Sequence, residues 1–265
     1  MKILSVGNSF SVDCQRYVRD IAEADKTEIT LGNLYIGGCS LERHCENLKS
    51  AKPEYEYFFN NKSLGSASIQ TALKDEDWDV VTLQQASHFS GMSETYFPYI
   101  EELSEYIRRS VPTCTIYINQ TWAYEYDSTH GQFPNYNCDR CLMHERLTDA
   151  YEKAARVIGA EIIPVGKAVS IARERKEFDP EKGGIPLTRD GFHLSYKYGR
   201  LLAGYVWYKK LCKADLDKNS FLPADYEYIG RDSQTDQPLY REIEGTRADA
   251  DLVKLLKICA SQAIV

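Results

Sequence analysis

The sequence predicts an α/β fold, a three-layer α/β/α sandwich with helices on both faces of a mostly parallel central sheet. The first observation behind this prediction is that short apolar runs alternate with amphipathic stretches, as they do where a parallel strand is followed by a helix. The second is a length of 265 residues with 43% hydrophobic side chains, which is enough for one large core. We therefore expect a single domain over residues 1–265, with a C-terminal extension at about 213–265.

The apolar runs place the strands, and the amphipathic stretches place the helices. Strands are predicted at residues 2–7, 28–36, 79–84, 113–119 and 161–164. Helical spacing of apolar residues predicts helices at 13–24, 94–110, 142–158, 195–212 and 247–261. Residues 55–70 are typical of a hairpin, because Asn60-Asn61 is a turn signal between two aromatic-rich runs.

Two further segments show no regular periodicity. Residues 122–141 are rich in Trp, Tyr, Asn and Gly, which predicts a long loop, and long loops in compact domains are often functional. Residues 215–246 are polar and rich in turn-forming residues.

The net charge of −7 argues against a nucleic-acid partner, because nucleic-acid-binding proteins usually present a basic face. No segment approaches the ~20 apolar residues that a bilayer span requires, so we expect no membrane association. Met1-Lys2 runs directly into the first predicted strand and leaves no room for a secretory signal. As written, the chain is expected in the cytoplasm, or in the periplasm or outside the cell if a leader was trimmed. The oligomeric state stays open.

The eight cysteines are spaced irregularly in a chain too large to need disulfides, so free thiols are expected, with Cys39 a small packed residue. His130, Cys138, Cys141 and His144 include a Cys-x-x-Cys pair and could in principle hold zinc. One close pair with two loosely placed histidines is more typical of a loop with incidental thiols. We therefore expect no metal, although zinc in residues 130–144 stays open.

Residues 7–11, Gly-Asn-Ser-Phe-Ser, stand where the first strand ends and the first helix has not yet begun. Glycine permits a tight strand-to-helix turn, and the helix that follows directs unpaired N–H groups towards any oxyanion formed there. This is a favourable place for a nucleophile such as Ser9. A serine at this position can equally serve only as a helix cap.

Asp190 and His193 precede an amphipathic helix in the segment Asp-Gly-Phe-His. Asp-x-x-His across a glycine-containing turn lets the carboxylate meet one imidazole nitrogen while the other faces outward as a general base. A serine hydroxyl needs such a base, because its own acidity is far too low at neutral pH. A solvated turn is the alternative for an isolated histidine, but the carboxylate at this spacing favours the base.

Two other strand ends carry groups that suit the same site. Gly37-Gly38 closes the second strand, where a backbone N–H is available, and Gln84-Gln85 closes the third, where a side-chain amide is available. Because ligands of open α/β sheets bind at the carboxyl ends of the strands, these segments are expected to converge at one rim.

Taken in this order, the motifs resemble those of the SGNH (GDSL-like) hydrolase superfamily over roughly residues 1–212. The resemblance implies a flavodoxin-like SGNH hydrolase fold and a catalytic triad of Ser9, His193 and Asp190. It also implies an oxyanion hole made by the Ser9 and Gly38 N–H groups with the Gln84 side chain. Gly37 and Gln85 remain alternates, because the usual Gly-Asp-Ser-Leu is Gly-Asn-Ser-Phe here and Gly-x-Asn-Asp is missing after the third strand.

The glutamine motif resembles that of superfamily branches that deacetylate carbohydrates. We therefore expect a serine esterase without a cofactor that acts on an acyl, preferentially acetyl, ester of a small molecule or glycan. Asn8, His88 and Trp122 are expected to contact the substrate. Aromatic residues of the 122–141 loop either form a sugar-stacking wall or anchor that loop. A lipase or thioesterase, or a glycan-binding protein without catalysis, are the alternatives.

Overall fold

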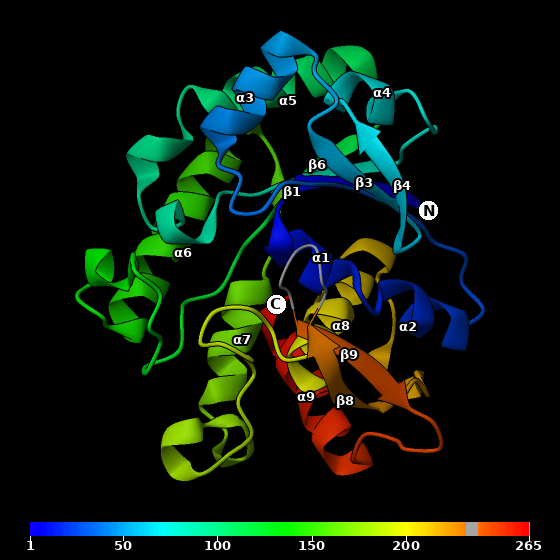
Figure 1. Cartoon of the computed structure of the whole chain (residues 1–265), viewed down its shortest axis with the longest axis vertical. Helices are drawn as coiled ribbons and strands as arrows, with labels where there is room; N and C mark the ends of the chain where they lie inside the picture. The colour runs from blue at the N-terminus through cyan, green and yellow to red at the C-terminus, as the bar shows by residue number, and fades with distance from the viewer. Residues whose placement is uncertain (232–237, 265) are drawn as a thin grey trace.

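A seven-stranded sheet with helices on both faces forms the centre of the molecule (Figure 1). The computed structural model describes residues 1–231 and 238–264. The strand order is β4-β3-β2-β1-β5-β6-β7, in which β3 pairs antiparallel with both its neighbours and all pairs from β2 to β7 are parallel. The predicted α/β/α sandwich with a mostly parallel sheet is confirmed.

The strands of this sheet are β1 (Lys2–Gly7), β2 (Thr30–Tyr35), β3 (Tyr55–Phe59), β4 (Lys62–Ala67), β5 (Val80–Leu83), β6 (Thr115–Asn119) and β7 (Glu161–Ile163). The five parallel strands lie within the ranges that the apolar runs predict. The predicted hairpin at residues 55–70 is β3 and β4, turning at Asn60-Asn61, where both residues have positive φ.

One face of the sheet carries α3 (Leu41–Ser50), α4 (Ile69–Leu73), α5 (Tyr99–Ser110) and α6 (Arg140–Ile158) (Figure 1). The other carries α1 (Ser9–Gln15), α2 (Val18–Ala24), α7 (Val165–Arg173), α8 (Tyr198–Cys212) and α9 (Ala250–Ala263). The central strand β1 lies between β2 and β5, with Val6 opposite both Leu34 and Leu83. The carboxyl ends of these three strands therefore meet at one rim.

Several elements differ from the sequence-based expectation. The helix predicted at 13–24 is two helices, because the chain bends at Arg16-Tyr17 and buries the Tyr17 ring. Helices α3 and α7 were not expected. The buried face of α3 includes the polar side chains of His44 and Asn47, so an apolar stripe does not mark it. Residues 215–246, expected only to be polar and turn-rich, contain the antiparallel pair β8 (Asp225–Arg231) and β9 (Pro238–Ile243).

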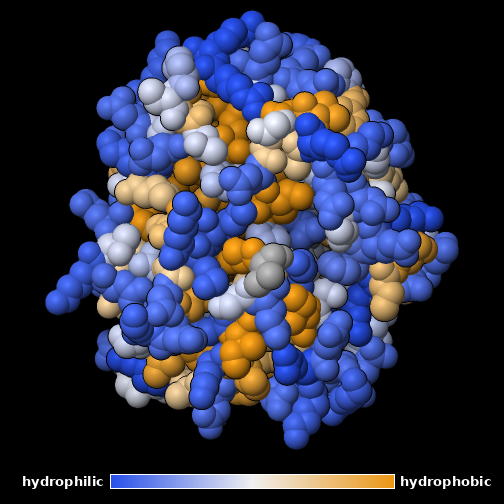
Figure 2. Space-filling view, turned by 180° about the vertical axis from the view of Figure 1, so that it is seen from behind, coloured by the Kyte–Doolittle hydropathy of each residue, from blue (hydrophilic) through white to orange (hydrophobic). Residues whose placement is uncertain are grey.

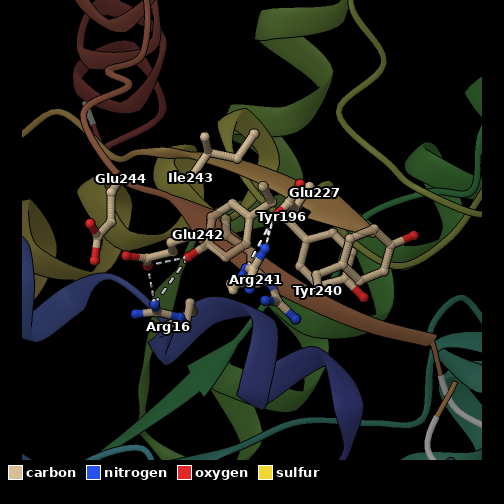
Figure 3. Close-up of a pocket in the computed structure, with 10 residues that line it drawn as sticks. Arg16, Tyr196, Glu227, Tyr240, Arg241, Glu242, Ile243 and Glu244 are labelled. Atoms are coloured by element: carbon tan, nitrogen blue, oxygen red, sulfur yellow. Dashed lines mark hydrogen bonds and ion pairs between the residues drawn. The ribbon is translucent and has the colours of Figure 1, made fainter. Parts of the chain in front are cut away.

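The C-terminal segment packs against the helices on one face of the sheet. Helix α9 contacts α7 and α8, and its residues Val253 and Leu256 belong to the same hydrophobic cluster as β1. The antiparallel pair β8–β9, called the β8–β9 hairpin below, lies near the end of α1, where Arg16, the residue after this helix, contacts Glu242 of β9 (Figure 3).

The face of the molecule opposite to the view of Figure 1 is largely hydrophilic, with small apolar areas between polar side chains (Figure 2). None of the helices in the described part of the chain combines the length and apolar character needed to cross a bilayer.

Candidate active site

Ser9, His193 and Asp190 form one continuous hydrogen-bonded chain. Ser9 is the first residue of α1, separated from the end of β1 by one residue, whereas the other two stand in the loop before α8. Nε2 of His193 lies 2.8 Å from Oγ of Ser9, and Nδ1 lies 2.7 Å from Oδ2 of Asp190. Residues 184 positions apart in the sequence are thus placed in the geometry of a nucleophile, its base and a carboxylate that orients the base.

Asp190 is held in its charged form by its neighbours. Burial acts to raise its pKa, but hydrogen bonds from the His193 side chain and from the backbone N–H groups of His193 and Phe192 outweigh burial and lower it. Oδ1 of Asp190 accepts from the two backbone N–H groups, and Oδ2 accepts from Nδ1–H of His193. Nε2 of His193 is therefore free to accept the proton of Ser9.

The turn that carries Ser9 is built by Asn8 and its neighbours. Asn8 caps α1 by accepting from the N–H of Phe10 at 3.0 Å, and its Nδ2 donates to the carbonyl of Cys39 at 3.1 Å. Gly7 allows the tight approach, since a Cβ there would lie 2.4 Å from Oγ of Ser11. Asn8 is only 1% exposed, which contradicts the expected substrate contact: its side chain faces the interior and is used to shape the turn.

Gln84 supports this turn from the end of β5. Its Nε2 donates to Oδ1 of Asn8 at 2.8 Å, and its Oε1 accepts from Nδ2 of Asn119, at the end of β6, also at 2.8 Å. We call Asn8, Gln84 and Asn119 the amide network. Because Gln84 is 1% exposed and bonded to Asn8, the structure does not place it as the expected oxyanion donor.

Gln85 is also bonded inside the protein. Its Nε2 donates to the carbonyl and hydroxyl of Thr95, and its Oε1 accepts from the N–H groups of Leu41 and Ala86. The alternate amide donor thus joins three segments and does not face the site.

The two glycines after β2 lie at the surface, whereas Gln84 and Gln85 are buried. Gly37 and Gly38 are both exposed, and Gly38 has a φ of +62°, a conformation that suits glycine. Within the described residues the Gly38 N–H makes no hydrogen bond, so it remains available, as does the N–H of Ser9 in the first turn of α1. Next to them, Cys39 is buried, as expected, and burial raises the pKa of its thiol to about 12.

The aromatic residues of the 122–141 loop anchor it, apart from Tyr126, which is 43% exposed. Trp122 is fully buried, stacks on Phe10 at 4.3 Å between ring centroids, and donates from Nε1 to the carbonyl of Phe192 at 2.7 Å. This contradicts the expected substrate contact of Trp122. The other buried aromatic side chains of the loop are those of Tyr124, Phe133 and Tyr136.

A partly exposed aromatic edge lies beside His193. Phe192 contacts His193 at 4.3 Å, His130 contacts Phe192 at 4.8 Å, and His88 stacks on His130 at 6.2 Å. Burial lowers the pKa of His88 and of His130, and the neighbouring His193 lowers the pKa of His130 further. The structure links His88 to His193 through His130 and Phe192, and the substrate contact of His88 stays a prediction. The sequence offered His130 only as a zinc candidate, because its proximity to His193 arises from folding.

The four residues considered for zinc are not gathered in one place. Cys138 and Cys141 are exposed, and His130 belongs to the aromatic edge. His144 and Cys141 line one cavity with Arg140, and the lining of that cavity includes neither His130 nor Cys138. Across residues 1–231 and 238–264, no group of three or more His, Cys, Asp or Glu side chains is placed to hold a metal ion.

Comparison with known proteins shows which family matches this chain and which solved structures share its fold. The family described as "Domain of unknown function (DUF4886)" matches residues 2–236. A solved DUF4886 family protein from Bacteroides uniformis is 33% identical, with a TM-score of 0.85 over 100% of this chain and 94% of that chain. A candidate SGNH hydrolase from Slackia heliotrinireducens is 26% identical, with a TM-score of 0.52 over 79% of this chain and 97% of that chain.

A lipase/acylhydrolase from Enterococcus faecalis is 14% identical, with a TM-score of 0.51 over 79% of this chain and 94% of that chain. No curated protein matches the chain significantly. The resemblance to the SGNH superfamily that the motifs indicate is confirmed at the level of the fold.

Proposed function

Because the chain belongs to the DUF4886 family and has the fold of SGNH hydrolases, we propose that it is a serine esterase that removes acyl, preferentially acetyl, groups from carbohydrates. The observation that carries the proposal is the hydrogen-bonded chain from Ser9 through His193 to Asp190. A protein that only binds a glycan has no need for these three groups in this order.

In the acylation step, Oγ of Ser9 attacks the ester carbonyl carbon while its proton passes to Nε2 of His193. The C–O bond to the sugar then breaks, and the sugar oxygen takes the proton back from His193. The products are the free alcohol and an acyl-Ser9 ester. Asp190 stays ionised and stabilises the imidazolium, consistent with its lowered pKa.

In the deacylation step, water attacks the acyl-enzyme carbonyl carbon while His193 accepts its proton. The bond between that carbon and Oγ of Ser9 then breaks, His193 returns the proton to Oγ, and the carboxylic acid leaves. Both tetrahedral intermediates place a negative oxygen beside the start of α1. We assign its stabilisation to the N–H groups of Ser9 and Gly38, with Gly37 as the alternate. This differs from the resemblance-based expectation only in leaving out the glutamine side chain, which bonds to Asn8.

The aromatic edge supports a carbohydrate as the alcohol portion. His88 and His130 are partly exposed, and their lowered pKa values keep both imidazoles neutral around pH 7. A neutral imidazole carries one donor and one acceptor, which suits sugar hydroxyl groups at His88. The ring nitrogens of His130 already contact the Gln132 N–H and the Tyr124 hydroxyl, so His130, like Phe192, offers its ring face to a sugar. A lipase or thioesterase would use the same triad on a different alcohol or thiol.

The nucleophile is tested by labelling with a fluorophosphonate probe. Wild-type protein is expected to form a covalent adduct and to hydrolyse p-nitrophenyl acetate, and Ser9→Ala is expected to do neither while keeping its circular dichroism spectrum. Ser63→Ala, an exposed serine on β4, is the matched control and is expected to label like wild type. Labelling of Ser9→Ala at the wild-type rate would show that another residue is the nucleophile.

The substrate is tested separately, with p-nitrophenyl esters of increasing chain length and a panel of acetylated saccharides. Acetate release from a saccharide with a higher kcat/KM than p-nitrophenyl acetate would support the carbohydrate assignment, because binding energy of the sugar is then used at the reacting centre. Rates that rise from acetate to octanoate, with no acetate released from any saccharide, would instead establish the lipase or thioesterase alternative.

A further inference from the structure

Asp13 is a buried carboxylate that is no part of the Ser9–His193–Asp190 chain but lies one helical turn after Ser9 on α1. Its side chain is 1% exposed, and it accepts from four nitrogen atoms. A carboxylate in such a position needs several charged or polar donors to offset its lost hydration. The identity of those donors indicates what Asp13 does.

All the donors come from the loop that carries the base or from the helix that follows it. The N–H of Leu194 donates to Oδ2 of Asp13 at 2.9 Å, and Nη1 of Arg189 lies 3.0 Å from the same oxygen. Arg200 of α8 donates from Nε at 2.8 Å and from Nη2 at 2.7 Å to Oδ1. Arg189 and Leu194 stand directly before Asp190 and directly after His193. Asp13 therefore holds both ends of the segment that contains the base and its carboxylate.

Backbone hydrogen bonds also join the two ends of the segment that carries Asp190 and His193. Thr188 and Leu194 form an antiparallel bridge, and the N–H of Arg189 donates to the carbonyl of His193 at 2.9 Å. Nη1 of Arg189 also donates to the carbonyl of Leu194. Residues 188–194 are thus a closed unit, and a shift of its Asp13 contacts would move the whole unit relative to α1.

Tyr196 covers Asp13, Arg189 and Arg200 on the side of the β8–β9 hairpin. The guanidinium groups of Arg189 and Arg200 lie 4.8 Å and 4.4 Å from the centre of its ring. On the hairpin, Tyr240 packs against Tyr196 with the two rings tilted by 38° and their centroids 4.1 Å apart, and both rings line the pocket beside the hairpin (Figure 3). We call Asp13, Arg189 and Arg200 the carboxylate–arginine cluster.

The loop has other anchors, but they come from a different part of the molecule. Trp122 donates to the carbonyl of Phe192, and the N–H of Glu125 donates to the carbonyl of Gly191 at 2.7 Å. Both anchors hold the loop to the segment after β6. Asp13 holds it to α1, the helix on which Ser9 is the first residue.

From these contacts we propose that Asp13 is a positioning residue that sets the distance between Oγ of Ser9 and Nε2 of His193 by docking the loop of the base on the helix of the nucleophile. The proposal rests on the proposed serine esterase function. An aspartate fits this role because both of its oxygens accept, whereas an asparagine would present an NH₂ group to Arg189, Arg200 or the Leu194 N–H. Displacement of reacting groups by about 1 Å can cost about 10²-fold in rate.

The test compares Asp13→Asn with wild type in hydrolysis of p-nitrophenyl acetate and in the rate of fluorophosphonate labelling, at a temperature where circular dichroism shows both proteins fully folded. We expect kcat and the labelling rate to fall by about 10²-fold with KM nearly unchanged, because the proton transfer is misaligned while the substrate contacts remain. Asp20→Asn, a more exposed carboxylate on α2 that pairs with Arg16, is the matched control and is expected to keep wild-type rates.

A milder variant keeps the proposal testable if Asp13→Asn does not fold. Arg189→Gln removes one partner of Asp13 and leaves Leu194 and Arg200 in place, so we expect about a 10-fold fall in kcat, again with KM nearly unchanged. A folded Asp13→Asn or Arg189→Gln protein with wild-type kcat and labelling rate, and only a lower melting temperature, would overturn the positioning role. Failure of wild-type protein to label at all would instead overturn the proposed function.

Discussion

The Ser9 turn and the His193 loop meet at a single hydrogen bond, yet the groups that hold them in place differ in charge. The turn is held by the neutral amide network of Asn8, Gln84 and Asn119. The loop is held by the charged carboxylate–arginine cluster around Asp13. The three amides and Asp13 are buried, so they must be satisfied by hydrogen bonds within the protein, whereas Arg189 and Arg200 are partly exposed.

The difference follows from where each region is anchored. The amides come from the ends of three adjacent strands, β1, β5 and β6, so short side chains can reach one another at low desolvation cost. The loop has no neighbouring strand of the central sheet, and long arginine side chains connect it to α1. One half of the site is therefore positioned by the sheet itself. The other half is positioned by an ion-pair cluster, in which removal of one partner leaves an uncompensated charge.

The largest effect is expected from the amide network. In Gln84→Leu, Oδ1 of Asn8 loses a donor and Nδ2 of Asn119 loses its oxygen acceptor, both in a buried place. We expect the free energy of unfolding to fall by about 3 kcal/mol, measured by urea denaturation, because each unsatisfied buried group costs about 1–3 kcal/mol. Gln262→Leu, on the exposed face of α9, is the control and should change stability little.

The same variant separates two roles of Gln84. If Gln84→Leu lowers kcat while its free energy of unfolding equals that of wild type, Gln84 acts on the oxyanion and not through Asn8. That outcome would contradict the structural role assigned to the amide network.

A smaller effect on stability is expected from a change of pH, through His44, the titratable residue next to the amide network. His44 is fully buried, bonds to Tyr55 at 2.7 Å and lies 3.5 Å from Sγ of Cys39, whose carbonyl accepts from Asn8. Burial, reinforced by the charge of Arg43, lowers the pKa of His44 from 6.5 to about 3. The unfolded imidazole therefore binds a proton at a higher pH than the folded one. Stability that is fully present above pH 6.5 is lost as the pH falls, by about 2 kcal/mol between pH 7 and pH 5.

The measurement is the free energy of unfolding in urea at pH 7, 6 and 5, for wild type and His44→Gln. We expect the variant to be less stable at pH 7 but to lose less on acidification, and equal slopes would contradict the assignment. Asp190, whose pKa lies below 3.8, titrates outside this range. The remaining histidines with lowered pKa values are present in both proteins and cancel in the comparison: His88, His130 and His144.

The smallest effect is expected from an exposed counterpart of the carboxylate–arginine cluster. Arg241 on β9 pairs with Glu227 on β8, but their side chains are 69% and 43% exposed, whereas the Asp13 side chain is 1% exposed. Solvent screens such a pair, so Arg241→Ala should change the free energy of unfolding by less than about 0.5 kcal/mol. A loss of several kcal/mol in urea denaturation would show that burial is not what separates the two clusters.

The elements that follow from short-range patterns were predicted from the sequence. The apolar runs placed β1, β2, β5, β6 and β7, because a buried parallel strand needs continuous apolar side chains. The hairpin at 55–70 followed from its turn residues. The break between α1 and α2 was not predicted, because it depends on Tyr17, whose hydroxyl bonds to the carbonyl of Tyr196, 179 positions away.

The sequence by itself determined which residues stand at the ends of β1, β2 and β5, and that Asp190 and His193 share a short turn, since these properties depend on neighbours along the chain. Only the tertiary structure decided which way the side chains at those ends point. Gln84 and Asn8 face each other in the interior, and His130 reaches His193 through Phe192. The physical reason is that a buried polar group takes whichever partner folding brings near. For Asp13, two such partners lie 176 and 187 positions away, beyond the reach of any local pattern.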